Sequence, residues 1–163
     1  MTRKLLDLAG IGSSRLHLEW VSSAEAQRFA QITTAVVNAV KDLGPLDRES
    51  LDLQLEGVQR TLDCEQIRWT VGKEKNLLAS GDVYGRKWGR EAYEAVLDSI
   101  LLTEYEKNLI YAALNKGAGS VRDLAAKTGL DLPRISFLLA QMEKGGQVEL
   151  KTFEDNKPQF AVI

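Results

Sequence analysis

The C-terminal third of the chain has the clearest pattern of apolar and polar positions. Apolar residues recur at helical spacing over residues 105–114, and Thr103 and Glu106 have the spacing of a capping box at a helix start. Ser120 and Asp131 are placed as N-caps of two further short helices, with a glycine turn between them. The pattern therefore predicts three short helices in succession.

After the third helix the spacing of apolar residues changes from helical to alternating. Val148 and Leu150 alternate with charged residues, and residues 159–162 alternate again after a turn at Asp155 and Asn156. These two segments predict a β-hairpin. Three helices with a glycine turn between the second and third, closed by a hairpin, is the order of a winged helix-turn-helix domain, which we predict over residues 103–163.

The N-terminal part has a different order of elements. Residues 15–21 alternate in polarity and predict a β-strand. A short helix over residues 4–9 precedes this strand, and a long amphipathic helix follows it, with a capping box at Ser22 and Glu25 and an end at Gly44. A helix, a strand and a helix thus follow one another, as they do in an α/β sheet. The apolar face of the strand comprises Leu16, Leu18 and Trp20, and the polar face Arg15, His17 and Glu19.

The predicted strand has no sequence partner nearby. The middle region predicts helices only, one over about residues 51–78 and another over residues 93–101. A lone strand leaves its backbone hydrogen-bonding groups unpaired, so it either pairs with another chain or ends a larger domain. We therefore expect a mainly α (α+β) protein, with a helix-strand-helix remnant and a helical middle region over residues 1–102 and the winged helix-turn-helix over residues 103–163.

Composition places the chain among globular proteins, since 44% of its residues are hydrophobic and 27% are charged. Its apolar stretches are shorter than the roughly 18 residues of a membrane span, and its N-terminus lacks the apolar core of a signal peptide. We therefore expect a soluble, cytoplasmic protein. The single cysteine, Cys64, excludes an intrachain disulfide and any multi-cysteine metal or iron-sulfur site built from this chain alone.

Charge bears on what the predicted winged helix binds. In a DNA-binding protein, the third helix would enter the major groove and the hairpin would reach the phosphates. The candidate contacts to DNA, or to a protein partner, are Arg134, Ser136, Gln141, Lys151 and Lys157. Residues 103–163 hold eight basic and eight acidic residues, and the expected hairpin tip carries Glu154 and Asp155. Because duplex binding draws on clustered positive charge, this balance favours a protein partner.

Five strings in roughly the first half of the chain stand out: LLDLAGI at 5–11, RLHLEWVS at 15–22, a helix ending in LGP at 43–45, IRWTVGKE at 67–74 and GDVYG at 81–85. Together they resemble the C-terminal part of the delta subunit of methyl-viologen-reducing hydrogenase. The resemblance implies a small iron-sulfur subunit that passes electrons between a hydrogenase or formate dehydrogenase module and heterodisulfide reductase. It also implies that the lone strand is the last strand of an α/β domain whose earlier strands are missing here.

The cysteines that hold this family's cluster have no counterpart in the sequence, so we expect no cofactor in this chain, and an iron-sulfur cluster or flavin only on partner subunits. The lone His17 and Cys64 are expected to be an exposed strand residue and a passive thiol. No nucleophile-base set or carboxylate pair is present, and no catalytic activity is expected of the isolated chain.

The leading hypothesis is a non-catalytic assembly or docking subunit of an anaerobic electron-transfer complex related to hydrogenase and heterodisulfide reductase, an oxidoreductase complex. The winged helix then serves protein-protein interaction, and subunit contacts are expected at Arg15, His17, Glu19 and Trp20. A homo-oligomer is compatible with this hypothesis. The alternative is a winged-helix DNA-binding transcriptional regulator, and an enzyme in its own right ranks last.

Overall fold

The computed structural model describes residues 1–154 and 157–163. The described residues form seven α-helices, one 3-10 helix and one two-stranded sheet, which confirms the mainly helical class with a C-terminal hairpin. In chain order the elements are α1 (Thr2–Leu8), η1 (Ser13–Arg15), α2 (Ala26–Leu43), α3 (Asp52–Asp63), α4 (Glu65–Ala79), α5 (Arg90–Asn115), α6 (Val121–Thr128), α7 (Leu132–Lys144), β1 (Val148–Glu154) and β2 (Lys157–Val162). None of the described helices combines the length and apolar composition that a membrane crossing requires.

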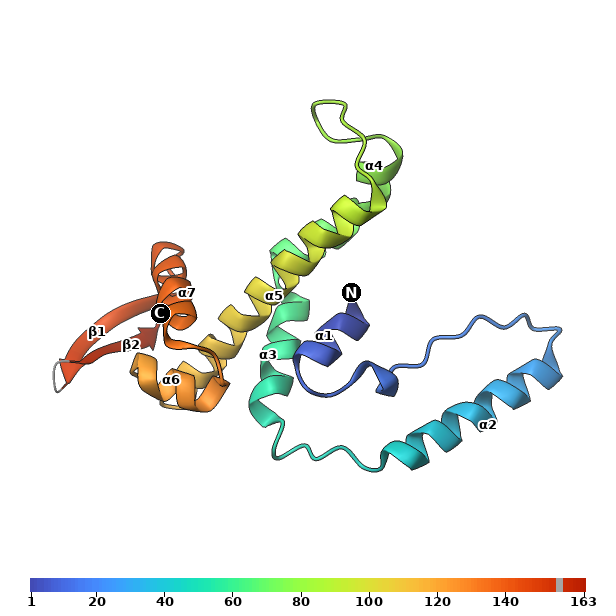
Figure 1. Ribbon diagram of the computed structural model, residues 1–163, viewed down its shortest axis with the longest axis horizontal. Coiled ribbons are helices and arrows are strands. Elements are labelled where there is room, and N and C mark those ends of the chain that lie inside the picture. The colour runs from blue at the N-terminus through green and yellow to red at the C-terminus, as the bar shows by residue number, and fades with distance from the viewer. Residues whose placement is uncertain (155–156) are drawn as a thin grey trace.

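Helix α5 is the central element, and Figure 1 shows it running obliquely from the loop after α4 to the C-terminal elements. The predicted helix start at Thr103 is wrong, because residues 90–115 form one continuous helix. The apolar face that begins with Leu97 and Leu101 continues through Tyr105, so burial of one stripe overrides the local capping pattern. The same helix crosses the predicted division between residues 102 and 103.

Two buried clusters lie along α5. The first joins α5 to α1 and α4 and comprises Leu5, Ala9, Ile67, Leu101, Tyr105 and Leu109. The second joins the end of α5 to α6, α7 and β1 and comprises Ile110, Ala113, Leu114, Ala118, Leu124, Ile135, Leu138, Leu139, Met142 and Val148. Leu53 of α3 packs against both clusters. One helix therefore carries the cores of the middle and C-terminal regions.

The single helix predicted over residues 51–78 is wrong, because the helix is interrupted at Cys64 and two helices, α3 and α4, take its place. Cys64 has an extended backbone (φ −62°, ψ 127°), which ends α3 and serves as the N-cap of α4. Both helices pack on α5, and α3 approaches closely enough that a Cβ on Gly57 would lie 3.3 Å from the Tyr105 ring. Neither glycine nor proline stands at the break, so no local signal marks it.

The second and third of the predicted C-terminal helices are confirmed. Ser120 and Asp123 form a reciprocal capping box at α6, and Gly129 ends that helix in the left-handed conformation. The Asp131 side chain accepts the Arg134 backbone N–H at 2.7 Å and caps α7. The apolar stripe of α7 is buried as expected.

The predicted hairpin is also confirmed, as an antiparallel pair with Val148 opposite Val162 and Leu150 opposite Phe160. A register shift between Leu150 and Thr152 interrupts the pairing. The backbone N–H of Phe160 donates to the Gly119 carbonyl at 2.9 Å and ties the hairpin to the start of α6. The turn predicted at residues 155 and 156 lies outside the described residues.

The strand predicted over residues 15–21 does not form within the described chain. Residues 13–15 form η1, and the segment after it is extended but belongs to no sheet in the described part of the chain. One of the two hydrogen bonds of the expected capping box at Ser22 and Glu25 forms, because the Ser22 N–H donates to Glu25 Oε2 at 2.8 Å. Helix α2 begins only at Ala26 and has no side-chain cap. An alternating segment becomes a strand only when a neighbouring strand accepts its hydrogen bonds, and the described residues offer none.

Candidate subunit interface

Residues 16–22 and α2 form one unit, which we call the N-terminal arm. Figure 1 shows the extended segment leaving η1 and α2 returning below it, away from the other helices. The base of the arm is held by Arg15, whose Nη1 donates to the Gly44 carbonyl at 3.0 Å and whose Nη2 donates to the Leu43 carbonyl at 3.2 Å. A cation at this place satisfies the last carbonyls of α2 and is stabilised by the helix dipole.

The extended segment of the arm has backbone N–H groups with no hydrogen-bond acceptor in the described chain. No hydrogen bond joins the N–H groups of residues 17–21 to any residue that the structure describes. Water hydrogen-bonds such groups in the isolated chain, whereas a neighbouring strand would accept hydrogen bonds from every second one of them. The segment therefore has the backbone chemistry of an open sheet edge.

The arm also exposes large apolar side chains. Trp20 is 83% exposed, Leu18 66% and Phe29 61%, and no residue of α2 is buried. The apolar stripe of α2 comprises Phe29, Ile32, Val36, Ala39, Val40 and Leu43. Of this stripe, Phe29, Val40 and Leu43 are exposed and the other three residues are half-buried. An amphipathic helix forms stably when its apolar face is covered, so the exposed part of this face marks an interaction site.

The subunit contacts predicted from sequence lie in this arm but differ in availability. His17, Glu19 and Trp20 are exposed, whereas the Arg15 side chain is engaged at the end of α2. The sequence prediction did not include the stripe of α2, because such spacing most often indicates core packing.

The face of α7 was the second surface singled out from sequence. Arg134 places Nε at 2.7 Å and Nη2 at 2.6 Å from Oε2 of Glu106, and Nη2 also lies 3.4 Å from the Thr103 hydroxyl. Its guanidinium carbon lies 5.7 Å from the centre of the Phe137 ring. The Arg134 charge is thus already neutralised within the chain.

The other predicted contacts on this surface, Ser136, Gln141, Lys151 and Lys157, are exposed. Helix α7 and strand β1 also carry exposed aromatic side chains, since Phe137 is 53% exposed and Phe153 64%. Aromatic residues of this kind are enriched where proteins contact proteins.

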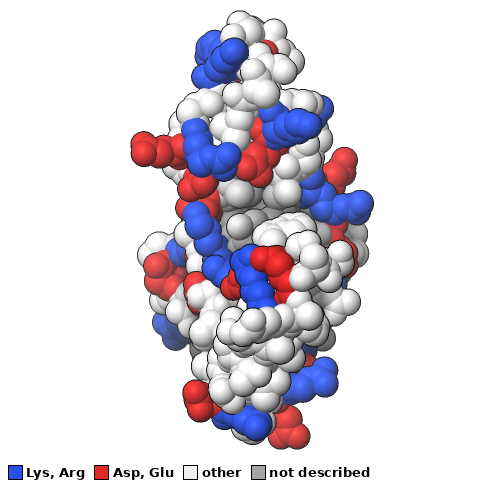
Figure 2. Space-filling model, turned by 90° about the vertical axis from the view of Figure 1, so that its right-hand side faces the viewer, with Lys and Arg blue, Asp and Glu red and all other residues white. Residues whose placement is uncertain are grey.

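Further basic residues near α5 are paired with carboxylates. Lys107 lies 3.0 Å from Glu104, and Lys116 lies against Asp52 and 3.3 Å from Glu56. Figure 2 shows lysine and arginine interspersed with aspartate and glutamate over the face on the α2 and α4 side, with no unbroken basic area. The lower part of that face, at the height of α2 in Figure 1, is mostly uncharged.

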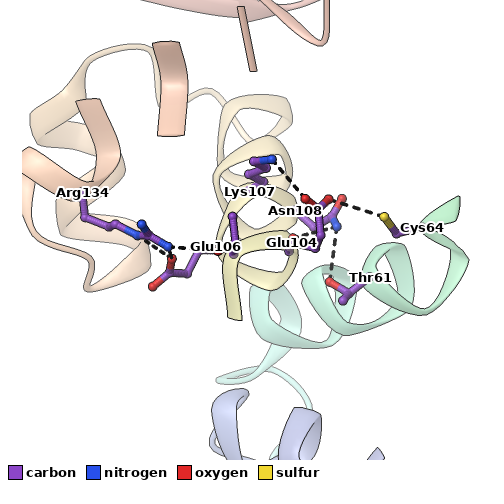
Figure 3. A network of polar contacts seen from close by, with 8 residues as sticks. Thr61, Cys64, Glu104, Glu106, Lys107, Asn108 and Arg134 are labelled. Carbon is purple, nitrogen blue, oxygen red and sulfur yellow. Dashed lines mark hydrogen bonds and ion pairs between the residues drawn. The ribbon is translucent and has the colours of Figure 1, made fainter. Parts of the chain in front are cut away.

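Cys64 lies in a polar network at the junction of α3, α4 and α5, seen in Figure 3. Its Sγ donates to Glu104 Oε2 at 3.4 Å, and Lys107 donates to the other oxygen of that carboxylate at 3.0 Å. Asn108 Nδ2 bridges the Glu104 carbonyl at 2.8 Å and the Thr61 hydroxyl at 3.3 Å.

Burial raises the pKa of the Cys64 thiol, and the neighbouring Glu104 charge acts in the same direction. The thiol therefore stays protonated and poorly nucleophilic at neutral pH. Among the described residues no three histidine, cysteine or acidic side chains gather as a metal site. An iron-sulfur cluster needs several thiolates, so this network does not fit one.

The sequence profile of one family, described as methyl-viologen-reducing hydrogenase, delta subunit, matches residues 1–44. The match covers α1, η1 and the whole N-terminal arm, and ends where α2 ends at Gly44. It suggests a relation to hydrogenase delta subunits for this part of the chain. The similar strings at 67–74 and 81–85 lie outside the match. No solved structure matches the chain.

Proposed function

We propose that this protein is a non-catalytic docking subunit of an anaerobic electron-transfer complex related to hydrogenase and heterodisulfide reductase. One observation carries the proposal: the stretch that matches the hydrogenase delta subunit, residues 1–44, includes the arm, which exposes large apolar side chains and backbone N–H groups that no other described residue contacts by a hydrogen bond. A segment related to a subunit of a redox complex, and lacking cover of its own, is suited to subunit contact.

Electron carriers belong to the partner in this proposal. The one thiol of the chain is protonated and paired with Glu104, so an iron-sulfur cluster would be held by partner subunits, and the proposal assigns any flavin to them as well. In this proposal the chain positions the partner subunit and carries no electrons itself.

The C-terminal region, residues 103–163, acts in this proposal as a winged helix-turn-helix domain that contacts protein. The end of α5, then α6, α7 and the hairpin follow in the order of that domain. Exposed Phe137 on α7 and Phe153 on β1 favour a protein partner, together with the engagement of Arg134 by Glu106.

A DNA-binding transcriptional regulator is the second candidate, and the order of the C-terminal elements is the observation that favours it. The equal numbers of basic and acidic residues over 103–163 weigh against it, because phosphate contacts supply most of the affinity for duplex DNA.

The proposal is tested by isolating the full chain, with an affinity tag at its C-terminus, from its native host under anaerobic conditions. We expect a stoichiometric complex with a subunit that contains iron-sulfur or flavin, seen in the visible spectrum and by metal analysis. Phe29→Asp should remove the partner, and Val83→Asp, at a position 93% exposed outside the arm, should retain it. Isolation without any redox subunit, or with one that both variants retain equally, would contradict the proposal.

A further inference from the structure

The extended segment of the arm is complementary to itself. Residues 15–21 read RLHLEWV, and antiparallel pairing centred on Leu18 sets Leu16 opposite Trp20 of a second copy. The same pairing sets His17 opposite Glu19 on the other face, and each pair occurs twice because the arrangement is twofold symmetric. Aromatic-aliphatic cross-strand pairs stabilise antiparallel strands, and an imidazole N–H opposite a carboxylate is placed to donate a hydrogen bond to it.

We infer that a second copy of this chain is the occupant of the N-terminal arm, and that the protein is a twofold dimer joined by these strands. Every second N–H group of residues 17–21, unbonded within the described chain, then donates to a carbonyl of the second copy. This inference concerns the same arm as the proposed function and assigns its cover to a second copy, so that a redox subunit would bind the dimer and not the free arm.

Helix α2 covers one face of the paired strands in this dimer. Leu18 and Trp20, exposed in the isolated chain, lie on the alternating apolar face, and the stripe of α2 supplies the surface to cover them. Two strands alone would be marginally stable in water, and the helices supply the apolar layer that they need.

The two α2 helices run antiparallel in the same arrangement, because each is tied to its own strand by Arg15 at the base of the arm. Arg28 and Asp42 each precede an apolar stripe residue, Phe29 and Leu43, and so lie on the same flank at opposite ends of the helix. Antiparallel helices bring Arg28 of one copy toward Asp42 of the other on both sides of the axis.

Charge also favours a second copy over a highly charged partner. The basic residues of residues 15–44 are Arg15, Arg28 and Lys41, and the acidic ones are Glu19, Glu25 and Asp42. A surface with balanced charge and a large apolar share is typical of an interface between identical chains.

The first test is the mass of the purified full chain by sedimentation equilibrium over a range of concentrations. We expect a species of twice the 18.1 kDa chain mass that dissociates on dilution. His17→Glu sets two pairs of glutamates opposite one another. It should raise the dissociation constant of the dimer about tenfold, because the unfavourable cross-strand interaction occurs twice. The double substitution His17→Glu with Glu19→His again sets histidine opposite glutamate, and should return the dissociation constant to near its original value.

The second test fixes the register with a thiol. With Cys64→Ser as background, Leu18→Cys places the introduced thiols on the symmetry axis, where paired residues have Cα atoms about 4.5–5.5 Å apart, a separation that a disulfide spans. We expect rapid covalent dimer formation, and slow formation for Val83→Cys at a position 93% exposed outside the arm.

A chain that stays monomeric at high concentration, or a dimer that Leu18→Cys does not trap, would overturn the inference. A monomer whose arm is covered only in a complex with a redox subunit would assign the arm to that subunit, so the inference would fail while the proposed function stood. A dimer that binds no redox subunit would support the inference and contradict the proposed function.

Discussion

Arg134 at the start of α7 places two guanidinium nitrogens, at 2.7 and 2.6 Å, on a single carboxylate oxygen of Glu106 in α5. The sequence predicts Arg134 as a contact to DNA or to a partner, and it predicts Glu106 as part of a capping box. The two residues instead join the helices that carry the second cluster. Their side chains are 30% and 12% exposed, so the ion pair is partly desolvated.

The first prediction concerns this pair. Arg134→Ala should lower the free energy of unfolding by about 1–2 kcal/mol, between the values typical of surface pairs and of buried ones. Glu106→Gln should act similarly, and the double variant should lose less than the sum, as urea denaturation will measure. The exposed Arg122 on α6 is the matched control, and Arg122→Ala should change stability by less than about 0.5 kcal/mol. Additive losses would mean that the pair is not coupled.

The second prediction separates the two candidate functions. Duplex DNA at physiological salt should bind no more tightly than about 10⁻⁴ M, the weak end of non-specific affinity. Fluorescence anisotropy against a labelled duplex measures this value. Lys151→Ala should leave the result unchanged, because Lys151 contributes no phosphate contact in a protein-binding domain. Micromolar binding would favour the regulator, if Lys151→Ala also reduces the slope of log affinity against log salt concentration by about one unit.

The third prediction concerns Cys64. Purified protein should be colourless and hold no stoichiometric iron or zinc, because one protonated thiol paired with Glu104 supplies no ligand set. Since burial raises the pKa of this thiol, alkylation at pH 7 should be slower than that of glutathione. Metal analysis and thiol titration check both statements. One metal or cluster per chain or per dimer, lost in Cys64→Ser, would refute this account of Cys64.

The fourth prediction concerns the loop after α4. Burial alone would raise the pKa of Asp82, but hydrogen bonds from the Arg86 side chain and from the backbone N–H groups of Arg86 and Tyr84 lower it to about 2. Since the unfolded value is 3.8, the contribution of Asp82 to stability is complete above about pH 4 and is lost as pH falls toward 2.

Carboxyl chemical shifts in an NMR titration will measure the pKa of Asp82. Arg86→Ala should move its midpoint up toward 3.8, and Lys87→Ala, a change at the exposed neighbour, should leave it low. An unshifted midpoint in the Arg86 variant would show that the backbone N–H groups alone hold this carboxylate.

Sequence predicted the parts of the fold that depend on neighbouring residues. Ser120, Gly129 and Asp131 act within one turn of helix, so their capping chemistry is visible without tertiary structure. Thr103 has the same local chemistry, but it lies within a helix whose stripe is buried on both sides of it.

The remaining features depend on contacts between distant parts of the chain. The break at Cys64 follows from packing two helices on α5, which the sequence at that position does not encode. Residues 15–21 have the alternation of a strand and are extended for most of their length, yet a strand exists only with its partner. The arm was foreseen as a place of subunit contact for this reason, while the role of the α2 stripe emerged from its exposure.

The central claim is that another chain covers the N-terminal arm, and hydrogen exchange tests it most directly. In the dilute isolated chain, the amides of residues 17–21 should exchange at nearly the rate of an unstructured peptide, because no described group accepts their hydrogen bonds. In the assembly isolated from the host, every second one of these amides, together with the amides of α2, should be protected at least about tenfold. Equal exchange of the arm in the isolated chain and in the assembly would contradict the claim.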